Sequence, residues 1–200
     1  MKDGWYRVRD VVASALGLAV LSPVLLAIGV AIRLDSDGPA YFRQVRVGQG
    51  GRPFRIHKFR TMTAGGTGPL VSTSTDARVT KVGAVLRRTK LDELPQLIDV
   101  LEGNMSLVGP RPEVPRFVAR WPNDARRIIL SVRPGVTDPT SVRYIDEGSL
   151  LAQAEDPELA YVQAVLPLKV ASYLSYVAER TFTKDLGILV ATVAALGRGR

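Results

Sequence analysis

The strongest pattern in the chain is one long apolar segment near its amino terminus. Residues 11–32 form a run of 22 residues without a charged side chain, and charged residues flank it on both sides. As a helix this run would be about 33 Å long, enough to cross a hydrocarbon core of about 30 Å. It exceeds the apolar region of a usual signal peptide, and no small-residue cleavage site follows it. We therefore expect a membrane helix that the mature protein retains.

A Ser-Pro pair, Ser22 and Pro23, lies at the middle of this run. Proline removes one helical hydrogen bond, and Ser followed by Pro is also typical of a helix start, with Ser22 as N-cap and Pro23 at the first position. A sharp bend would return both ends to one face of the membrane as a re-entrant helix, whereas a shallow bend would let the helix span. Proline kinks are common in spanning helices, so this pair alone favours the spanning topology.

Shorter patterns follow the apolar run. Residues 40–60 alternate loosely around a glycine-rich turn at 48–51, which predicts a short β-hairpin. Residues 79–102 have a helical pattern that Pro95 interrupts, and a proline-rich irregular loop follows at 105–115. Further helices are predicted over about residues 116–132, 150–180 and 185–196.

The last predicted helix, residues 185–196, is apolar on most of its faces and is followed by Gly-Arg-Gly-Arg. Such a helix lies either in the headgroup region of a membrane, with the arginines on anionic lipid, or packed against the rest of the protein. The pattern favours neither position.

The amino-acid composition limits the catalytic groups and metal ligands that the chain can use. The chain has no cysteine, which excludes disulfides, thiolate nucleophiles and Cys-ligated metal sites, and it has one histidine, His57. The net charge is +8, and the first 135 residues hold 21 of the 27 Lys and Arg residues. This field predicts an anionic partner: nucleic acid, a nucleotide or a phospholipid surface. Basic residues also dominate residues 33–60, which places this side of the membrane segment in the cytoplasm.

The richest chemical pattern is a pair of adjacent carboxylates that follows a basic cluster. Asp92 and Glu93 come shortly after Arg87, Arg88 and Lys90. A carboxylate pair at a helix start can hold Mg²⁺ through oxygen ligands, and with arginines nearby it suits phosphoryl transfer, with one aspartate as the covalent nucleophile. Ordinary helix capping is the alternative interpretation of the same residues.

Four motifs in register resemble the bacterial sugar transferase family, the monotopic phosphoglycosyl transferases. They are KFRTM (58–62), DARVTKVGAVLRRTKLDELPQL (76–97), MSLVGPRPE (105–113) and RPGVT (133–137). The resemblance continues to the carboxyl-terminal segment at 166–189, so it covers nearly the whole chain.

The resemblance implies a membrane enzyme that transfers a sugar 1-phosphate from a nucleoside diphosphate sugar, usually a UDP-sugar, to polyprenol phosphate and releases UMP. In the family the aspartate of the Asp-Glu dyad is the nucleophile and forms a phospho-sugar aspartyl intermediate, which gives ping-pong kinetics. This role falls on Asp92, and Glu93 would help Asp92 hold Mg²⁺. The reaction would initiate synthesis of a bacterial glycoconjugate such as exopolysaccharide or lipopolysaccharide.

The resemblance also implies a set of substrate-binding residues around the dyad. Where the family often has an arginine about ten residues after RPG, this chain has Ile145, and the nearby Arg143 is the candidate replacement. Residues 138–141, Asp-Pro-Thr-Ser, and Asn104 also depart from the frequent pattern, and the first departure bears on sugar recognition. The expected substrate-binding residues are Lys58, Arg60, Arg87, Arg88, Pro110, Arg111, Pro112 and Arg143.

The implied architecture is an α-dominated α+β fold with a short β-hairpin. Residues 1–34 would form a re-entrant membrane helix broken at Ser22 and Pro23, and residues 35–200 a catalytic domain that ends in interfacial amphipathic helices. The enzyme would be monotopic on the cytoplasmic face of the bacterial inner membrane. Its expected partners are a UDP-sugar, polyprenol phosphate and membrane phospholipids; nucleic acid is not expected, and a homodimer is one assembly that the sequence permits.

Two other functions fit the same residues. A membrane-anchored polyanion-binding protein would use the basic residues for lipid or nucleic acid, with Asp92 and Glu93 capping a helix. A nucleotide-sugar hydrolase would keep the carboxylates and the metal but use water as the acceptor. Loss of Asp92 would leave the first function intact, and dependence on polyprenol phosphate separates the second from the transferase.

Overall fold

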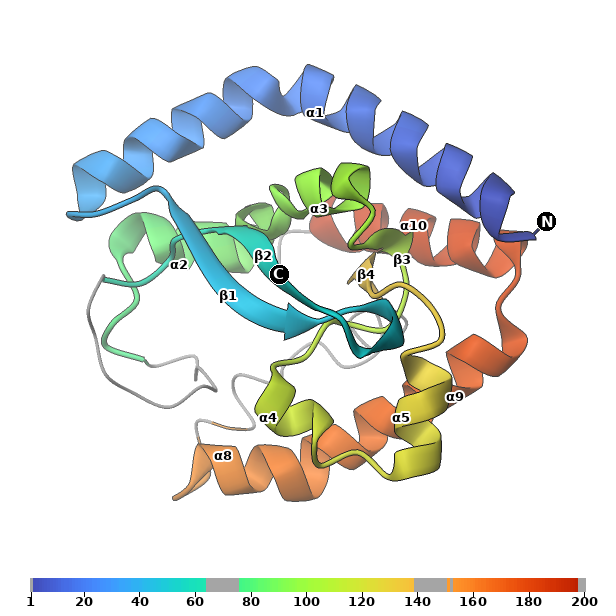
Figure 1. Ribbon diagram of the computed structural model, residues 1–200. Helices are drawn as coiled ribbons and strands as arrows, with labels where there is room; N and C mark the ends of the chain where they lie inside the picture. The colour runs from blue at the N-terminus through green and yellow to red at the C-terminus, as the bar shows by residue number, and fades with distance from the viewer. Residues whose placement is uncertain (1, 64–75, 139–150, 152, 198–200) are drawn as a thin grey trace.

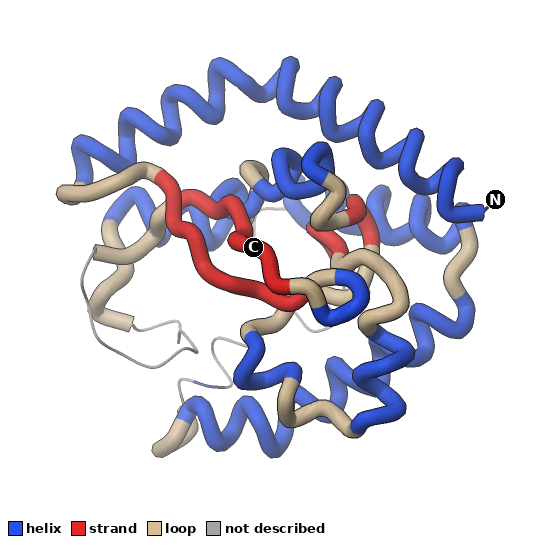
Figure 2. The backbone as a smooth tube through the Cα atoms, viewed as in Figure 1, coloured by secondary structure: helices blue, strands red, loops and turns tan. Residues whose placement is uncertain are grey.

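A computed structural model describes residues 2–63, 76–138, 151 and 153–197 of the chain. Helices predominate, and Figure 2 shows the strands near the centre with helices around them. This agrees with the α-dominated α+β class. In chain order the elements are α1 (Lys2–Asp35), β1 (Tyr41–Val47), η1 (Gln49–Gly51), β2 (Pro53–Phe59), α2 (Lys81–Thr89), η2 (Leu91–Glu93), α3 (Gln96–Glu102), β3 (Ser106–Val108), α4 (Pro115–Val118), α5 (Asn123–Ile129), β4 (Gly135–Thr137), α8 (Pro157–Ala160), η3 (Tyr161–Val165), α9 (Leu166–Glu179) and α10 (Phe182–Gly197).

The membrane segment forms one continuous helix, α1, so the expected interruption at Ser22 and Pro23 does not occur. Pro23 has no N–H to bond the carbonyl of Ala19, one turn earlier. The Ser22 hydroxyl donates to that carbonyl instead, at 2.9 Å, so its role is the reverse of the N-cap expected for it. With the carbonyl satisfied, the helix continues through the proline, and Figure 1 shows α1 as an arch.

Both halves of α1 pack on the same globular body. Near its start, the Arg7 guanidinium donates to the carbonyls of Val100 and Leu101 at the end of α3. Near its end, Ile32 is buried with Phe59 of β2 and Leu86 of α2. Between them, a side chain added at Gly17 would meet Leu97 of α3. Within the described residues α1 is the one helix long and apolar enough to cross a membrane, and little of it is buried.

The predicted hairpin is confirmed by β1 and β2. These strands pair antiparallel from Tyr41 opposite Phe59 to Val47 opposite Pro53, and the two end rings stack at 5.3 Å. Gly50 and Gly51, with φ of 67° and 79°, make the connecting turn, which explains the glycines there. A second, parallel pairing of β3 with β4 was not predicted.

The helix predicted at 79–102 is interrupted earlier than expected. Lys90 adopts the left-handed conformation with φ of 57° and ends α2, and the short 3₁₀ turn η2 follows. Pro95 then stands directly before α3, where a proline costs no hydrogen bond. The segment at 116–132 likewise divides into α4 and α5 around Pro122. The Lys90 break is important because it presents η2 as a separate turn.

The main apolar core lies between α4, α5 and the α8–α9 segment. Phe117, Trp121, Ile129, Leu151 and Tyr173 are among its buried members. The predicted helix at 150–180 contains a π-helical turn, η3, between α8 and α9.

The final helix, α10, has two different faces. Ile188 and Leu189 face a buried cluster that includes Leu107 and Val108 of β3. Phe182, Leu186, Val190 and Val193 are between 49% and 69% exposed. The helix therefore packs on the protein and also presents an apolar outer face.

Candidate active site

The 3₁₀ turn η2 carries the carboxylate pair. Asp92 is 2% exposed, and its Oδ2 lies 2.9 Å from the ammonium group of Lys58 on β2. Its other oxygen, Oδ1, is buried and has no hydrogen-bond partner among the described residues. A capping carboxylate would accept hydrogen bonds from backbone N–H groups, so this geometry does not fit the capping alternative.

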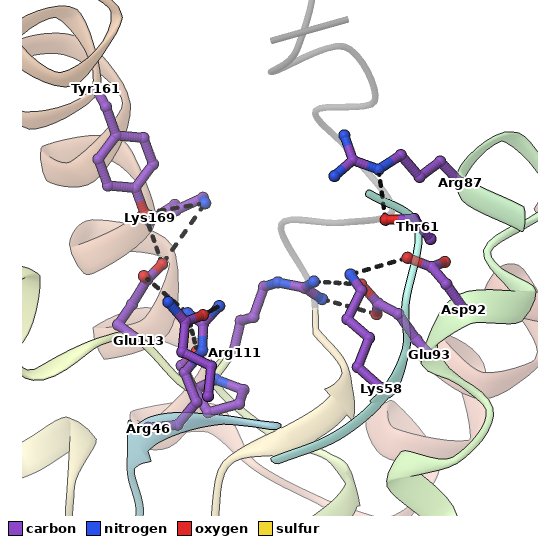
Figure 3. Close-up of polar contacts among 12 residues, drawn as sticks. Arg46, Lys58, Thr61, Arg87, Asp92, Glu93, Arg111, Glu113, Tyr161 and Lys169 are labelled. Carbon is purple, nitrogen blue, oxygen red and sulfur yellow. Dashed lines mark hydrogen bonds and ion pairs between the residues drawn. The ribbon is translucent and has the colours of Figure 1, made fainter. Parts of the chain in front are cut away.

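Glu93 is held by two cations. Arg111 donates to both carboxylate oxygens, at 3.0 Å for Oε2, and Lys58 lies 3.3 Å from Oε1. Burial alone would raise the pKa of Glu93, but the charges of Arg111 and Lys58 outweigh it and hold the pKa well below its usual range. The Glu93 charge in turn raises the pKa of Arg111 well above its usual value. Within the described part of the chain, the dyad therefore has one fully paired carboxylate and one with an oxygen that makes no hydrogen bond (Figure 3).

Arg87 lies on the other side of Asp92, on α2. Its Nε donates to the hydroxyl of Thr61 at 2.9 Å. Burial lowers the pKa of Arg87, and the Asp92 charge acts in the opposite direction. Gly83 makes this approach possible, because a Cβ there would lie 2.1 Å from the Thr61 carbonyl oxygen.

Other predicted residues lie elsewhere. The Arg60 guanidinium turns to the end of α1 and donates to the carbonyls of Ile32, Ser36 and Asp37, so the structure gives it a capping contact and no contact with the dyad. Arg88 is exposed on α2. Arg143, together with Ile145 and residues 139–141, lies outside the described residues.

Pro110 and Pro112 are buried on either side of Arg111 and shape the loop that carries it. The residue that follows them, Glu113, was not among the expected site residues. Its carboxylate accepts a hydrogen bond from the Tyr161 hydroxyl at 2.6 Å and lies 3.7 Å from Lys169 and 3.8 Å from Arg46. The only signal for Glu113 was its place at the end of the MSLVGPRPE motif.

Two groups of residues could be considered for a metal. His57, Asp99 and Glu102 lie close enough to share an ion, but the His57 ring contacts Asp99 at 2.9 Å and Arg43 at 2.6 Å, so both of its nitrogens are engaged. Burial raises the pKa of Asp99. The free Oδ1 of Asp92 is an oxygen ligand of the kind that Mg²⁺ prefers. Both groups therefore offer oxygen ligands that could hold a metal ion.

Among the described residues, the arrangement combines an aspartate oxygen without a partner, a paired glutamate and three basic side chains, which come from β2, α2 and the loop before α4. Lys58, Arg87 and Arg111 can neutralise phosphate oxygens, and Asp92 can attack phosphorus. These are the groups that phosphate chemistry requires.

Comparison with known proteins identifies the class more closely. The family model described as bacterial sugar transferase matches residues 1–199. The chain therefore belongs to the bacterial sugar transferase family, and it is a phosphoglycosyl transferase, an enzyme that moves a sugar 1-phosphate.

Its relatives carry names that agree with this class. The chain is 43% identical to a UDP-glucose:undecaprenyl-phosphate glucose-1-phosphate transferase of Caulobacter vibrioides, over 95% of this chain and 68% of the relative. It is 43% identical to a UDP-N-acetylgalactosamine-undecaprenyl-phosphate N-acetylgalactosaminephosphotransferase of Aeromonas hydrophila, over 66% of this chain and 32% of the relative. An exopolysaccharide production protein of Rhizobium leguminosarum is 34% identical over 97% of this chain and 96% of the relative.

Proposed function

We propose that this enzyme transfers a sugar 1-phosphate from a UDP-sugar to undecaprenyl phosphate, releases UMP and so starts the synthesis of a bacterial glycoconjugate or exopolysaccharide. The observation that carries the mechanism is the buried Asp92 carboxylate, with Oδ2 held by Lys58 and Oδ1 without a partner in the described part of the chain. The names of the relatives support the two substrates.

In the first half-reaction, Oδ1 of Asp92 attacks the phosphorus that carries the sugar. A bond forms between this oxygen and phosphorus, the bond to the bridging oxygen breaks, and UMP leaves with that electron pair. Arg87, Arg111 and Lys58 hold the phosphate oxygens and offset the charge that develops on them.

In the second half-reaction, an oxygen of undecaprenyl phosphate attacks the same phosphorus. The bond to Asp92 breaks and returns the carboxylate, and the product is a lipid diphosphate that carries the sugar. UMP leaves before the lipid attacks, so the two substrates react in separate steps.

Asp92 and Glu93 are the residues that would hold Mg²⁺, Glu93 in exchange for one of its contacts with Arg111 or Lys58. Bound there, it would neutralise phosphate charge that the basic residues leave uncompensated. Lys58 holds Oδ2 of Asp92 whether or not Mg²⁺ is bound, and so fixes the orientation of this carboxylate.

We also propose a monotopic topology in which α1 enters one leaflet and returns. Asp10 accepts a hydrogen bond from Ser106 at 2.5 Å, and Asp35, at the other end of α1, accepts one from the Val82 backbone at 3.0 Å. Since both ends bind one globular body, they lie on one side of the membrane, which we assign as the cytoplasmic face of the inner membrane. The exposed large apolar residues of α1 would contact lipid: Trp5, Val8, Val12, Leu16, Val20, Val24, Leu26, Val30 and Leu34.

The test is UMP release by the full chain in nanodiscs, with undecaprenyl phosphate, Mg²⁺ and a panel of UDP-sugars that includes UDP-glucose and UDP-N-acetylgalactosamine. We expect sustained UMP release with one or two of the sugars only. Without the lipid phosphate, UMP release should stop at about one equivalent per enzyme, the amount released when each Asp92 forms one phospho-sugar intermediate. Sustained release without lipid would identify a hydrolase, and no release with any UDP-sugar would contradict the proposed donor.

A further inference from the structure

Glu113 lies at the centre of a buried polar cluster next to the active site. The residue is 5% exposed, and three side chains converge on its carboxylate: Tyr161, Lys169 and Arg46. Lys169 also lies 3.2 Å from the Tyr161 hydroxyl oxygen. Figure 3 shows this cluster beside the group formed by Arg111, Glu93 and Lys58.

The same cluster holds the backbone of the loop that bears Arg111. Arg46 Nη1 donates to the carbonyl of Pro112 at 3.2 Å, and the Val47 N–H donates to the carbonyl of Glu113 at 3.0 Å. These two bonds attach the carboxyl-terminal side of the loop to β1.

The amino-terminal side of the loop is fixed by a different element, β4. Gly109 donates to the carbonyl of Thr137 at 3.1 Å, and Gly135 donates to the carbonyl of Pro110 at 2.9 Å. A Cβ on Gly109 would lie 2.5 Å from the Arg133 carbonyl oxygen, so this approach requires glycine. Arg111 therefore projects to Glu93 from a loop attached on both sides.

An irregular turn places the Tyr161 hydroxyl on Glu113. Tyr161 begins the π-helical turn η3, and its ring packs on Phe117 with ring centroids 4.7 Å apart. Single π-helical turns are uncommon and are found frequently near functional sites.

Stability alone is a weak reason for this cluster. Taking charged groups out of water is costly, and apolar residues of similar size often hold a core equally well or better. A role in fixing one conformation of the adjoining loop gives the cluster a physical purpose.

We infer that Glu113 is a positioning residue: its buried contacts with Tyr161 and Arg46 fix the loop at Arg111, and so hold the Arg111 guanidinium where it pairs with Glu93 and receives a phosphate of the sugar donor. This inference rests on the proposed function for the identity of that donor. The attachment of the loop itself does not depend on it.

The experiment compares Glu113→Gln and Tyr161→Phe in the full chain in nanodiscs. Glu113→Gln removes the charge that the buried Lys169 and the partly buried Arg46 face, so Tyr161→Phe, which removes only a hydroxyl group, is the milder variant. Glu158→Gln is the matched control, because it removes a carboxylate that pairs with the exposed Arg116 on the surface. The donor KM should rise about tenfold in the two cluster variants with a smaller change in kcat, as expected for a weakened contact with the bound substrate. The control should match the parent.

A second background tests whether the effect passes through Arg111. In Arg111→Lys, adding Tyr161→Phe should change the donor KM by less than about twofold, because residues that act through one contact are not additive. Equal effects of Tyr161→Phe in both backgrounds, or an unchanged KM with a lower melting temperature, would assign the cluster a structural role only and overturn the inference.

Hydrogen exchange gives a readout that needs no turnover. The amide of Val47, which is bonded to the Glu113 carbonyl, should exchange faster in Glu113→Gln and Tyr161→Phe than in Glu158→Gln. Unchanged exchange at this amide would overturn the inference. A parent enzyme without turnover but with these exchange differences would contradict the proposed function while leaving the positioning role supported.

Discussion

Lys58 bridges the two acids of the dyad: its Nζ lies 2.9 Å from Oδ2 of Asp92 and 3.3 Å from Oε1 of Glu93. This single ammonium group therefore sets the rotation of the Asp92 carboxylate and leaves the other oxygen available. Because Lys58 comes from the hairpin and the dyad from η2, the relative position of these two elements determines the direction in which the nucleophile points.

Replacing Lys58 with methionine keeps much of the side-chain volume and removes the charge. We expect kcat to fall about a hundredfold, the scale of a misplaced reacting group, and the melting temperature to fall as well, because the buried Asp92 loses its ion-pair partner. Initial rates of UMP release would measure this. A rate within a few-fold of the parent would show that Lys58 does not orient Asp92.

Asp92→Asn should reduce turnover about a thousandfold or more, because an amide cannot form the phospho-sugar intermediate. Membrane association and melting should change little. Incubation with a donor radiolabelled in the sugar should label the parent protein covalently and leave the variant unlabelled.

The control for that experiment is Asp124→Asn. Asp124 is an exposed carboxylate on α5 that pairs with Arg127, and its loss should alter neither the labelling nor the rate. Label retained by the Asp92 variant would assign the covalent bond to another residue.

Gly83→Ala tests the contact between α2 and the segment after β2. The added Cβ would overlap the Thr61 carbonyl, and Thr61 accepts the hydrogen bond from Arg87. We expect a loss of about 1–3 kcal/mol of stability, typical of overpacking, together with a lower rate. Thermal melting measures the first effect, and Gly187→Ala, where the Cβ meets open space, is the matched control. Equal melting of the two variants would contradict the packing at Gly83.

The pH dependence of stability should reveal the charge on Glu93. Its folded pKa lies below the ordinary value of 4.5, so the stabilisation from its ionised form is present above about pH 4.5 and is lost as the pH falls through the folded pKa. The difference in melting temperature between the parent and Glu93→Gln should therefore be constant at neutral pH and shrink only in acid.

Asp99 should show the opposite dependence. Burial raises its pKa above 3.8, so its favourable contribution is present in acid and is lost as the pH rises through the folded value. The parent should lose stability relative to Asp99→Asn as the pH increases through that value. If the stability difference from the parent changed with pH in the same direction for Glu93→Gln and Asp99→Asn, the opposite pKa shifts of Glu93 and Asp99 would be contradicted.

The outer face of α10 should contact lipid. The chain has no cysteine, so Val190→Cys provides a unique thiol for an environment-sensitive fluorophore. In nanodiscs its emission should shift to the blue and be quenched by spin-labelled lipid, since Val190 is 62% exposed on an apolar face. Arg127→Cys on α5 is the control and should report water. Identical emission at both sites would show that this face does not reach the membrane.

The elements that depend on local pattern could be predicted from the sequence. The apolar run became α1, and the glycine turn joined β1 to β2. Two features could not be predicted from the sequence. Lys90 adopts a left-handed conformation that is usual for glycine. The pairing of β3 with β4 joins segments about 30 residues apart, and no local pattern reports such a pairing. In α1 the Ser22 hydroxyl donates to the Ala19 carbonyl that Pro23 leaves without its helical donor, and the sequence does not specify this direction of the hydroxyl.

The residues of the candidate site likewise fall into those that the sequence indicated and those that it did not. The family motifs named Lys58 and Arg111 as substrate-binding residues, and the structure places both side chains in contact with the dyad. The same motifs did not distinguish Arg60, whose guanidinium binds the end of α1, from the basic residues at the dyad. Glu113 could not be assigned a partner, because Tyr161 and Lys169 approach it from a helix about 50 residues away.

The attachment of both ends of α1 has a consequence for how the enzyme can be handled. Arg9 pairs with the fully buried Asp185 of α10, and Ile32 closes the cluster around Phe59 and Leu86. Deleting the first 34 residues would remove these contacts and expose Phe59, which lies on the same strand as Lys58. Helix α1 thus supports the strand that carries Lys58, and a version of this transferase truncated before residue 35 should lose the geometry of Asp92.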